Sequence, residues 1–320
     1  MPEHHRILSS FTPFHGQVPA YFTGDFVGAK ISHEFVAGYK EPQAEPLHLD
    51  AGFPSFDEEY FEWIALLEAV AAADGCFTMI ELGAGFGRWV VRGGLAAGQR
   101  GLPFKLAAVE AVPAVYAWLR RHFVNNGIPP EEHMLLHGAA TEKAGEVRFN
   151  IAGPRGSEWD QRDLNGWYGQ HMTPEHDLAA RGEPDGTYHG LPVTRHTTGW
   201  RSIGVPGVSL SGILRELGAV DLIDMDIEGE ELPIVTVNIE ALDRQVKRLH
   251  IGTHSKEIEA GLREVLGSHG WQCTADYSLF SKVQTPFGEI SFENGAQTWI
   301  NPRDVGAAGP AGRLRRWFQR

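Results

Sequence analysis

A glycine-rich turn between a short apolar segment and a helix constrains this chain more than any other feature. Residues 79–89 read MIELGAGFGRW, so Gly83, Gly85 and Gly87 follow the apolar segment at alternating positions. Because glycine tolerates left-handed backbone, this spacing is typical of a tight turn from a buried strand into a helix. Such turns bind the phosphates or the ribose of a nucleotide-like cofactor.

Strands and helices alternate on both sides of this turn. We predict a helix over residues 57–73 and then the strands FTMIEL, FKLAAVEA and HMLLHGAA, with a helix after each of the first two. Beyond residue 207 the strands VDLIDMDIEG and VKRLHIGTH resume the alternation, and a hairpin, EISFENGAQTWI, is expected to turn at Asn294 and Gly295. The pattern predicts an α/β fold with a doubly wound, mostly parallel seven-stranded sheet.

Changes in composition and hydrophobic periodicity divide the chain into four parts. Residues 1–56 show no sustained period and are expected to form an extended N-terminal arm, whereas residues 57–302 carry the alternating pattern. Residues 151–207 interrupt it with a stretch rich in Gly, Pro, His and aromatic residues, which we expect to be an irregular insertion that covers a site. Residues 303–320 end in a basic tail, which is expected to be solvated.

Composition and charge narrow the class of protein. A net charge of −13 over 320 residues disfavours a nucleic-acid partner, because phosphate backbones require a positive surface. Two cysteines, Cys76 and Cys273, are too few for a disulfide framework, so a reducing cytoplasm is expected. No apolar run reaches the length of a membrane span. We expect a cytoplasmic enzyme with a small-molecule or glycan substrate, and a homo-oligomer stays open.

The residues around the glycine turn favour one cofactor. Arg88 stands where the dinucleotide fingerprint needs its third glycine, so that fingerprint is not met. Glu81 ends the strand before the turn, where a carboxylate would repel a pyrophosphate but suit the amino group of S-adenosylmethionine. Glu110 ends the next strand, where a carboxylate can accept both ribose hydroxyls. The alternative is a plain strand–helix connection without a ligand.

A row of acids in VDLIDMDIEGEE is the most unusual stretch of the sequence. Asp224, Asp226 and Glu228 share one face of a strand, where neighbours two apart lie ~6.6 Å from each other. At an effective dielectric of ~20 each adjacent pair of charges would repel by about 2.5 kcal/mol. A cation, a raised pKa, backbone N–H groups or exposure at the strand end would offset that repulsion. Asp226 and Glu228 are therefore interpreted as helix caps, as an acid that takes a proton from a substrate, or as Mg²⁺ ligands.

The next strand ends in HIGTH and brings a histidine to the same edge. By spacing, His250 and His254 share a face, and His254 is placed to face Asp226 across neighbouring strands. It would serve as a base, a metal ligand or a positive partner for the acids. The catalytic candidates are Asp226, Glu228 and His254, and the same three residues form the candidate metal set.

The order of these motifs resembles the FkbM-type methyltransferases. The resemblance rests on ELGAGFG, VEAVP, HGAATEKAGEV, VDLIDMDIEGEE and GTHSKEIE, and covers roughly residues 57–302. Its most specific element is D-x-D-x-E-G-x-E. The resemblance implies a Rossmann-like class I methyltransferase domain that transfers a methyl group from S-adenosylmethionine to hydroxyls of sugars and natural products.

The resemblance also implies roles for individual residues. It assigns the methionine and ribose parts of the cofactor to the glycine turn, the ribose to Glu110, and the acceptor hydroxyl to Asp226 and Glu228. The implied cofactor set comprises Glu81, Gly83, Ala84, Gly85, Gly87, Glu110, Ala139 and Ala140, the last two at the adenine edge. Within the insertion, Trp167, Tyr168 and Gln170 are expected over the pocket, since flat aromatic rings stack on sugars. Alternatively, these aromatic residues pin the insertion to the body.

Two other functions remain open at this stage. An NAD-dependent oxidoreductase or epimerase would share the acid at Glu110, although Glu81 and Arg88 argue against it. A non-catalytic sugar-binding module with a degenerate cofactor site is the other alternative, and the intact glycine turn argues against that one.

Overall fold

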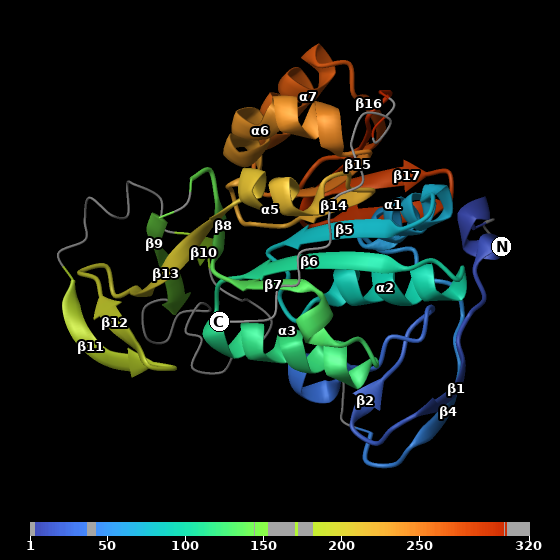
Figure 1. Cartoon of the computed structure of the whole chain (residues 1–320), viewed down its shortest axis with the longest axis horizontal. Coiled ribbons are helices and arrows are strands. Elements are labelled where there is room, and N and C mark those ends of the chain that lie inside the picture. The colour runs from blue at the N-terminus through green and yellow to red at the C-terminus, as the bar shows by residue number, and fades with distance from the viewer. Residues whose placement is uncertain are drawn as a thin grey trace.

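Seven strands form the central sheet of the computed structural model (Figure 1). The structure describes residues 4–36, 43–143, 145–152, 170–171, 182–303 and 305. From edge to edge the order is β16–β19–β15–β14–β5–β6–β7, and β19 runs antiparallel to its two neighbours. The strands are β5 (Phe77–Leu82), β6 (Phe104–Glu110), β7 (Met134–His137), β14 (Leu222–Met225), β15 (Arg248–Thr253), β16 (Gln272–Tyr277) and β19 (Gly295–Ile300). The predicted doubly wound, mostly parallel seven-stranded sheet is confirmed.

Helices cover both faces of this sheet. The helices are α1 (Tyr60–Ala72), α2 (Arg88–Gln99) and α3 (Pro113–Asn125) on one face, and α5 (Leu210–Leu217), α6 (Glu231–Gln245) and α7 (Lys256–Ser268) on the other. Neighbouring strand residues point to opposite cores: Met79 packs in the first and Ile80 in the second. Both faces are therefore buried, as parallel sheets require. No helix in the described ranges is long and apolar enough to cross a membrane.

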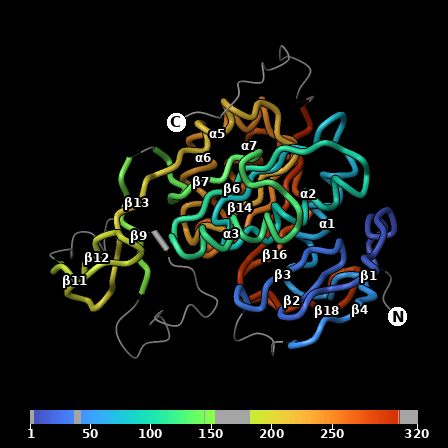
Figure 2. Tube along the Cα trace, turned by 60° about the horizontal axis from the view of Figure 1, so that its bottom comes forward, coloured from blue at the N-terminus to red at the C-terminus, as the bar shows by residue number. Residues whose placement is uncertain are grey.

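The N-terminal arm lies against α2 and α3 (Figure 2). Its elements are η1 (Arg6–Ser10), β1 (His15–Val18), β2 (Phe22–Thr23), β3 (Ile31–Ser32), η2 (His33–Val36) and β4 (Leu47–Asp50). Phe35 stacks on Phe86 with ring centroids 5.4 Å apart. The guanidinium of Arg92 lies over the rings of both Trp63 and Trp89, at 4.4 and 4.3 Å from their centroids. Asp25 of the arm accepts a hydrogen bond from its Nε at 2.8 Å.

A second sheet forms a separate lobe beside the carboxyl ends of β6 and β7 (Figures 1 and 2). It contains β8 (Ala139–Thr141), β9 (Gly145–Ala152), β10 (Gln170–His171), β11 (Glu183–Tyr188), β12 (Leu191–Arg195) and β13 (Arg201–Ser209). The prediction of an irregular insertion is wrong for residues 183–207, which are mostly strand. Val193, Ile203 and Val205 are buried and form a small core together with Ala111, Ala139 and Ile151. Trp167 and Tyr168 lie outside the described residues, and Gln170 is described only as a backbone position in β10.

Two expectations about strand pairing and bounds need correction. The hairpin expected at Asn294 and Gly295 is wrong, because β18 (Gly288–Phe292) pairs with β17 (Ser281–Thr285) and β19 pairs with β15 and β16. By entering the central sheet, β19 satisfies backbone groups on both of its edges, which pairing with β18 alone would not do. The segment HMLLHGAA is two strands, β7 and β8, since the chain leaves the central sheet at Gly138; the short η3 (Pro130–Glu132) precedes them.

Candidate active site

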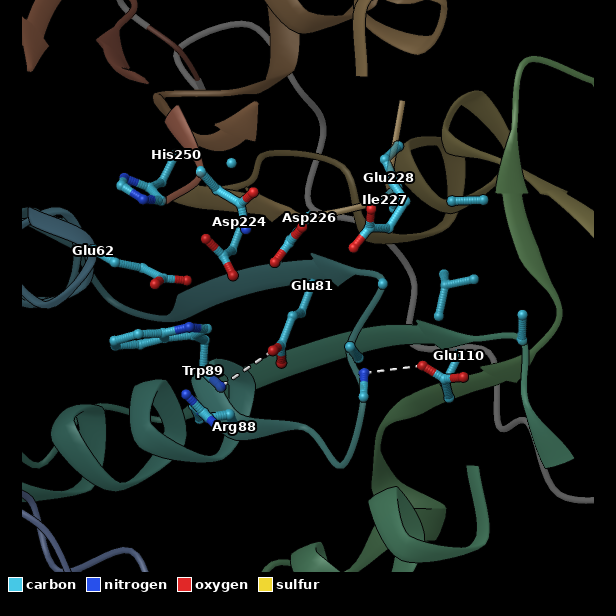
Figure 3. Close-up of a pocket in the computed structure, with 18 of the residues that line it drawn as sticks. Glu62, Glu81, Arg88, Trp89, Glu110, Asp224, Asp226, Ile227, Glu228 and His250 are labelled. Carbon is cyan, nitrogen blue, oxygen red and sulfur yellow. Dashed lines mark hydrogen bonds between the residues drawn. The ribbon is translucent and has the colours of Figure 1, made fainter. Parts of the chain in front are cut away.

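A cavity of about 360 Å³ opens at the carboxyl edge of the central sheet (Figure 3). It lies at the ends of the neighbouring strands β5 and β14. The strand that follows β5 in the central sheet, β6, lies on one side of this pair, and the strand that follows β14, β15, lies on the other side. This reversal of strand order is the place where open α/β sheets bind ligands. The volume lies within the range of small-molecule sites.

The glycine turn adopts the left-handed conformation that its sequence requires. Gly83, Gly85 and Gly87 have φ angles of 75°, 54° and 78°. The N–H groups of Gly83 and Ala84 both donate to the carbonyl oxygen of Val109, at 3.1 and 2.9 Å, which ties the turn to β6. Gly83, Ala84 and Gly85 line the cavity. Gly87 faces elsewhere, and a Cβ there would meet Leu119 of α3 at 2.4 Å, so this glycine permits helix packing.

Glu81 of β5 lines the cavity, and its carboxylate is hydrogen-bonded to the start of α2. Its carboxylate accepts the N–H groups of Trp89 at 3.2 Å and Val90 at 2.8 Å, two donors that the first turn of a helix leaves without partners. Burial raises the pKa of Glu81 to about 7, while these backbone hydrogen bonds oppose the rise. Glu81 therefore fixes the turn to the helix, a role that the sequence did not indicate.

Glu110 joins the end of β6 to the glycine turn. One carboxylate oxygen accepts the N–H of Gly85 at 2.9 Å, and the other accepts the N–H of Val112 at 2.6 Å. Burial raises its pKa to about 8, against the lowering effect of these hydrogen bonds. Ala139 and Ala140 line the same end of the cavity, and Ala139 is paired with Gly207 of the second sheet. The residues expected at the ribose and adenine are thus adjacent.

Carboxyl groups dominate the lining of the cavity. Eight of them contribute: Glu58, Glu59, Glu62, Glu81, Glu110, Asp224, Asp226 and Glu228. Arg88 is also part of the lining, and it forms an ion pair with Glu59. The cavity therefore favours a ligand that carries positive charge.

Glu62, Asp224 and His250 meet at the base of the cavity (Figure 3). One ligand atom of each lies within 4.8 Å of the others. Burial, followed by the charges of neighbouring carboxylates, raises the pKa of both Glu62 and Asp224 well above the usual range. Burial lowers the pKa of His250 to about 4, so this imidazole is neutral, and its Nδ1 lies 2.8 Å from Oγ1 of Thr298.

Asp226 and Glu228 follow β14 at the rim of the cavity. Their side chains are 60% and 38% exposed, in contrast to the buried Asp224. Exposure is one of the ways by which the repulsion within the acid row can be offset. Glu228 has a φ of 54°, a backbone conformation that residues other than glycine rarely adopt. Burial, together with the charges of Asp226 and Glu231, raises its pKa although His254 lowers it.

His254 lies behind the rim and bridges three acids. Its Nε2 is 3.0 Å from Asp226 and 3.8 Å from Glu228, and its Nδ1 is 2.9 Å from Glu231. Burial favours the neutral ring, but the hydrogen bonds to Asp226 and Glu231 outweigh it and raise the pKa to about 11. His254 faces Asp226, as its position predicted, but its side chain is only 12% exposed and is not among the residues that line the cavity.

Glu231 is a site residue that the sequence interpretation missed. It is the last acid of D-x-D-x-E-G-x-E, begins α6 and is fully buried. Besides His254, its carboxylate accepts the N–H groups of Ile227 at 3.1 Å and Gly229 at 3.0 Å. It therefore shapes the loop that carries Asp226 and Glu228. The motif itself was the available signal, since its fourth acid had no assigned role.

Comparison with known proteins gives one curated relative of similar sequence. No model of a known protein family matches the chain. A protein named "Putative methyltransferase" from Jannaschia sp. (strain CCS1) is 28% identical over 228 residues, which covers 70% of this chain and 74% of the relative.

Solved structures give more distant similarities. The precorrin-6y C5,15-methyltransferase from Geobacter metallireducens is 9% identical, with a TM-score of 0.39 over 74% of this chain and 85% of that chain. The C-terminal domain of the precorrin-6Y C5,15-methyltransferase from Rhodobacter capsulatus is 10% identical, with a TM-score of 0.39 over 76% and 89%.

The assignment of the chain rests on its own strand order and on its curated relative. A seven-stranded sheet with one antiparallel strand beside its edge, and a glycine turn at the point of reversal, is the Rossmann-like architecture of class I methyltransferases. The relative bears the same activity in its name. The chain is a methyltransferase of the S-adenosylmethionine-dependent class.

Proposed function

We propose that this enzyme methylates a hydroxyl group of a sugar, a glycan or a related natural product, as the FkbM-type proteins do. The observation that carries the proposal is the position of Asp226. Its carboxylate lies exposed at the rim of a cavity whose other end is formed by the glycine turn and Glu110. An acceptor at the rim would meet the exposed carboxylates of Asp226 and Glu228 before the buried Asp224.

The residues of the turn fit S-adenosylmethionine. At Gly83 a Cβ would lie 1.9 Å from the carbonyl oxygen of Asp226, so the close approach of the two loops depends on a glycine there. Glu110 uses each carboxylate oxygen for one backbone N–H, and each oxygen retains capacity to accept a ribose hydroxyl. When bound, S-adenosylmethionine supplies a methyl group already activated by its sulfonium charge.

The charge of the cavity argues against the oxidoreductase or epimerase alternative. A dinucleotide carries a pyrophosphate with two negative charges, and it would have to enter among eight carboxyl groups. S-adenosylmethionine carries a sulfonium and an ammonium group instead, both of which such a cavity would stabilise. Asp224 lies opposite Glu81 in the sheet register, and burial raises the pKa of Asp224 and of Glu62. A cationic ligand beside these two acids would favour their ionised forms, whereas a pyrophosphate would disfavour them further.

Asp226 is the group we assign to proton removal. The ring of His254, whose Nε2 lies 3.0 Å from the carboxylate, holds Asp226 in place. A protonated His254 has no lone pair to accept a proton, so we give it a positioning role in place of the base role. Glu228 would orient the acceptor from the same rim.

Mg²⁺ does not fit the set Asp226, Glu228 and His254. Both ring nitrogens of His254 already lie within 3.0 Å of carboxylate oxygens, and Mg²⁺ prefers oxygen ligands to imidazole. The charge that would draw a cation to these acids is already supplied by the imidazolium. We therefore propose methyl transfer without a metal in this set.

Two measurements test the proposal. Calorimetric titration with S-adenosylhomocysteine, with NAD⁺ as the control and with or without Mg²⁺, should give micromolar binding of the first ligand alone. Transfer of a labelled methyl group should then be measured to panels of sugars, glycans, amines and RNA. Labelling of a hydroxyl acceptor supports the proposal; labelling of amines or RNA alone contradicts the acceptor class while leaving the enzyme class intact.

A further inference from the structure

A two-stranded ribbon in the N-terminal arm presents four polar side chains on one face. β1 and β4 pair antiparallel, with His15 opposite Asp50 and Gln17 opposite His48. Alternate residues of a strand share a face, so all four side chains point the same way, toward solvent. Val18, which follows Gln17 in β1, is buried on the opposite face. The ribbon thus has an apolar inner face and a polar outer face rich in metal-ligand types.

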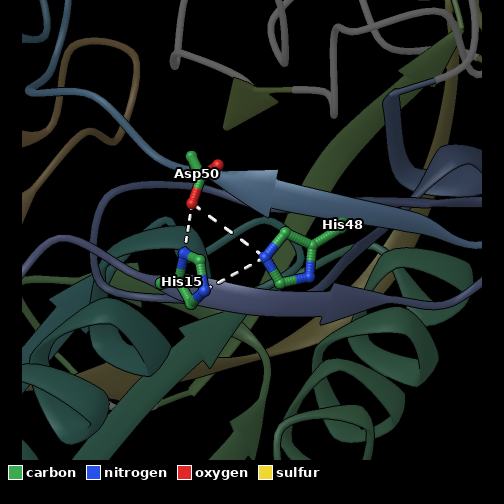
Figure 4. Close-up of side chains that lie close together, drawn as sticks. All are labelled: His15, His48 and Asp50. Atoms are coloured by element: carbon green, nitrogen blue, oxygen red, sulfur yellow. Dashed lines mark hydrogen bonds and ion pairs between the residues drawn. The ribbon is translucent and has the colours of Figure 1, made fainter.

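Three of these side chains converge on one another (Figure 4). Nε2 of His48 lies 3.1 Å from Nε2 of His15 and 4.0 Å from Oδ1 of Asp50. Nδ1 of His15 contacts the same oxygen of Asp50. One ligand atom from each residue lies within 4.8 Å of the other two. Two ligands bound to one tetrahedral Zn²⁺ ion at 2.0–2.1 Å stand ~3.3 Å apart. The 3.1 Å between the two Nε2 atoms and the 4.0 Å between His48 and Asp50 are close to that spacing, and the contact of His15 Nδ1 with Asp50 must open for Nε2 of His15 to be the ligand atom.

A second-sphere partner is also present. Nδ1 of His48 lies 3.4 Å from the carboxamide nitrogen of Gln17, the residue opposite it in the ribbon. Since the oxygen and nitrogen of a glutamine side chain can exchange places by rotation, the same carboxamide can accept the Nδ1–H of His48. That contact leaves the lone pair of Nε2 free for a metal ion. Metal-bound histidines characteristically donate their other N–H to such a partner.

The ligand types select the class of ion. Two imidazoles with one carboxylate suit Zn²⁺, Ni²⁺ or Cu²⁺, whereas Mg²⁺ and Ca²⁺ prefer oxygen ligands alone. None of the three residues lines the cavity of the candidate active site. A ribbon of two strands with four residues each is short, and isolated pairs of this size are marginal in water. An ion shared by both strands would fasten the ribbon.

We propose that His15, His48 and Asp50 bind one divalent transition-metal ion, with Zn²⁺ as the expected ion, and that this ion clamps β1 to β4. Three protein ligands leave a fourth position for water. The site is independent of methyl transfer, since it lies outside the cavity, and it acts on the stability of the arm.

The test uses the full chain without a histidine tag. Calorimetry with ZnCl₂ after treatment with EDTA should show one ion per chain with a micromolar dissociation constant. His48→Gln and His15→Gln should each weaken binding at least tenfold. Both side chains are exposed, and circular dichroism of each variant in EDTA checks that it folds. Co²⁺ should give the visible absorption of a tetrahedral site in the unmodified protein, and this absorption should disappear in both variants.

Two matched variants separate this site from other histidines. His189→Ala removes another exposed histidine, at the turn between β11 and β12, and should leave Zn²⁺ binding unchanged. His254→Gln removes the histidine that lies beside Asp226 and Glu231, another group of potential metal ligands. This variant should also leave Zn²⁺ binding unchanged. The proposal is overturned if His48→Gln binds Zn²⁺ as tightly as the unmodified protein, or if His254→Gln abolishes binding.

Discussion

The carbonyl oxygen of Asp226 occupies the space beside Gly83 so closely that a Cβ on this glycine would lie 1.9 Å from it. The turn that follows β5 and the acid loop that follows β14 are therefore in backbone contact. The cofactor end and the acceptor end of the cavity share this contact, so a change at one is expected to disturb the other.

Gly83→Ala should lower both stability and cofactor affinity. The new methyl group must displace the Asp226 backbone, and alanine at a φ of 75° adds a cost of ~1–2 kcal/mol. Gly75→Ala is the matched control, because Gly75 has a φ of 73° with nothing within 4 Å of its Cβ position. Thermal unfolding and titration with S-adenosylhomocysteine should show a larger loss for Gly83→Ala, and lost affinity in that variant alone. Equal losses in both variants would contradict the proposed contact.

Glu110→Ala should weaken binding of S-adenosylhomocysteine at least tenfold and also lower the melting temperature. The substitution leaves the N–H groups of Gly85 and Val112 without their acceptor, at about 1–3 kcal/mol for each one that stays buried. Glu110→Gln retains one acceptor oxygen and should show an intermediate affinity. Unchanged affinity in Glu110→Ala, measured by the same titration, would remove this residue from the cofactor site.

Asp226→Asn should abolish turnover and spare the cofactor. General-base catalysis contributes roughly 10²–10⁴ in rate, so labelled methyl transfer should fall by at least 10². The affinity for S-adenosylhomocysteine should stay within about twofold, because the amide has the size of the carboxylate and the backbone contact to Gly83 remains. Asp74→Asn, at an exposed acid before β5, serves as the control. Joint loss of affinity and turnover would place Asp226 at the cofactor.

His254 should make the stability of the protein depend on pH in a defined direction. Its pKa is raised from 6.5 to about 11, so its contribution is present in full below 6.5 and is lost as the pH rises toward 11. Melting temperatures of the unmodified protein and of His254→Gln, measured from pH 6 to pH 10, should therefore converge with rising pH. Divergence over the same range would show that His254 is neutral in the folded protein.

The sequence predicted the parts of the fold that local patterns determine. β5 matches the predicted segment FTMIEL, β6 ends one residue before the predicted segment FKLAAVEA does, and α2 and α3 follow these two strands as predicted. β19 could not be placed in this way, because an apolar strand after Asn294 and Gly295 pairs as well with a sheet edge as with its chain neighbour. Only long-range packing decides between the two partners.

The candidate site shows the same division. The edge position of Asp226 and His254 followed from counting residues along two strands. The pairing of Glu231 with His254 could not be predicted in this way, because it depends on how the start of α6 is placed beside the end of β15. The place of Glu62 in the cavity could not be predicted for another reason. Glu62 lies in α1 between Phe61 and Trp63, in a segment whose apolar pattern predicts only core packing.

The position of Arg92 bears on how this enzyme can be dissected. Arg92 is 6% exposed, and its guanidinium donates hydrogen bonds to the carboxylates of Asp25 at 2.8 Å and Glu59 at 3.5 Å. A fragment that starts at residue 57 would retain both tryptophans around this cation and lose its nearer counter-charge. Breaking a buried ion pair from one side typically costs 3–5 kcal/mol, a large share of the stability of a domain. A truncation at the predicted boundary of residue 57 is therefore expected to destabilise the protein. The arm supplies a counter-charge to a buried cation of the core, so we expect the smallest fragment that folds to include it.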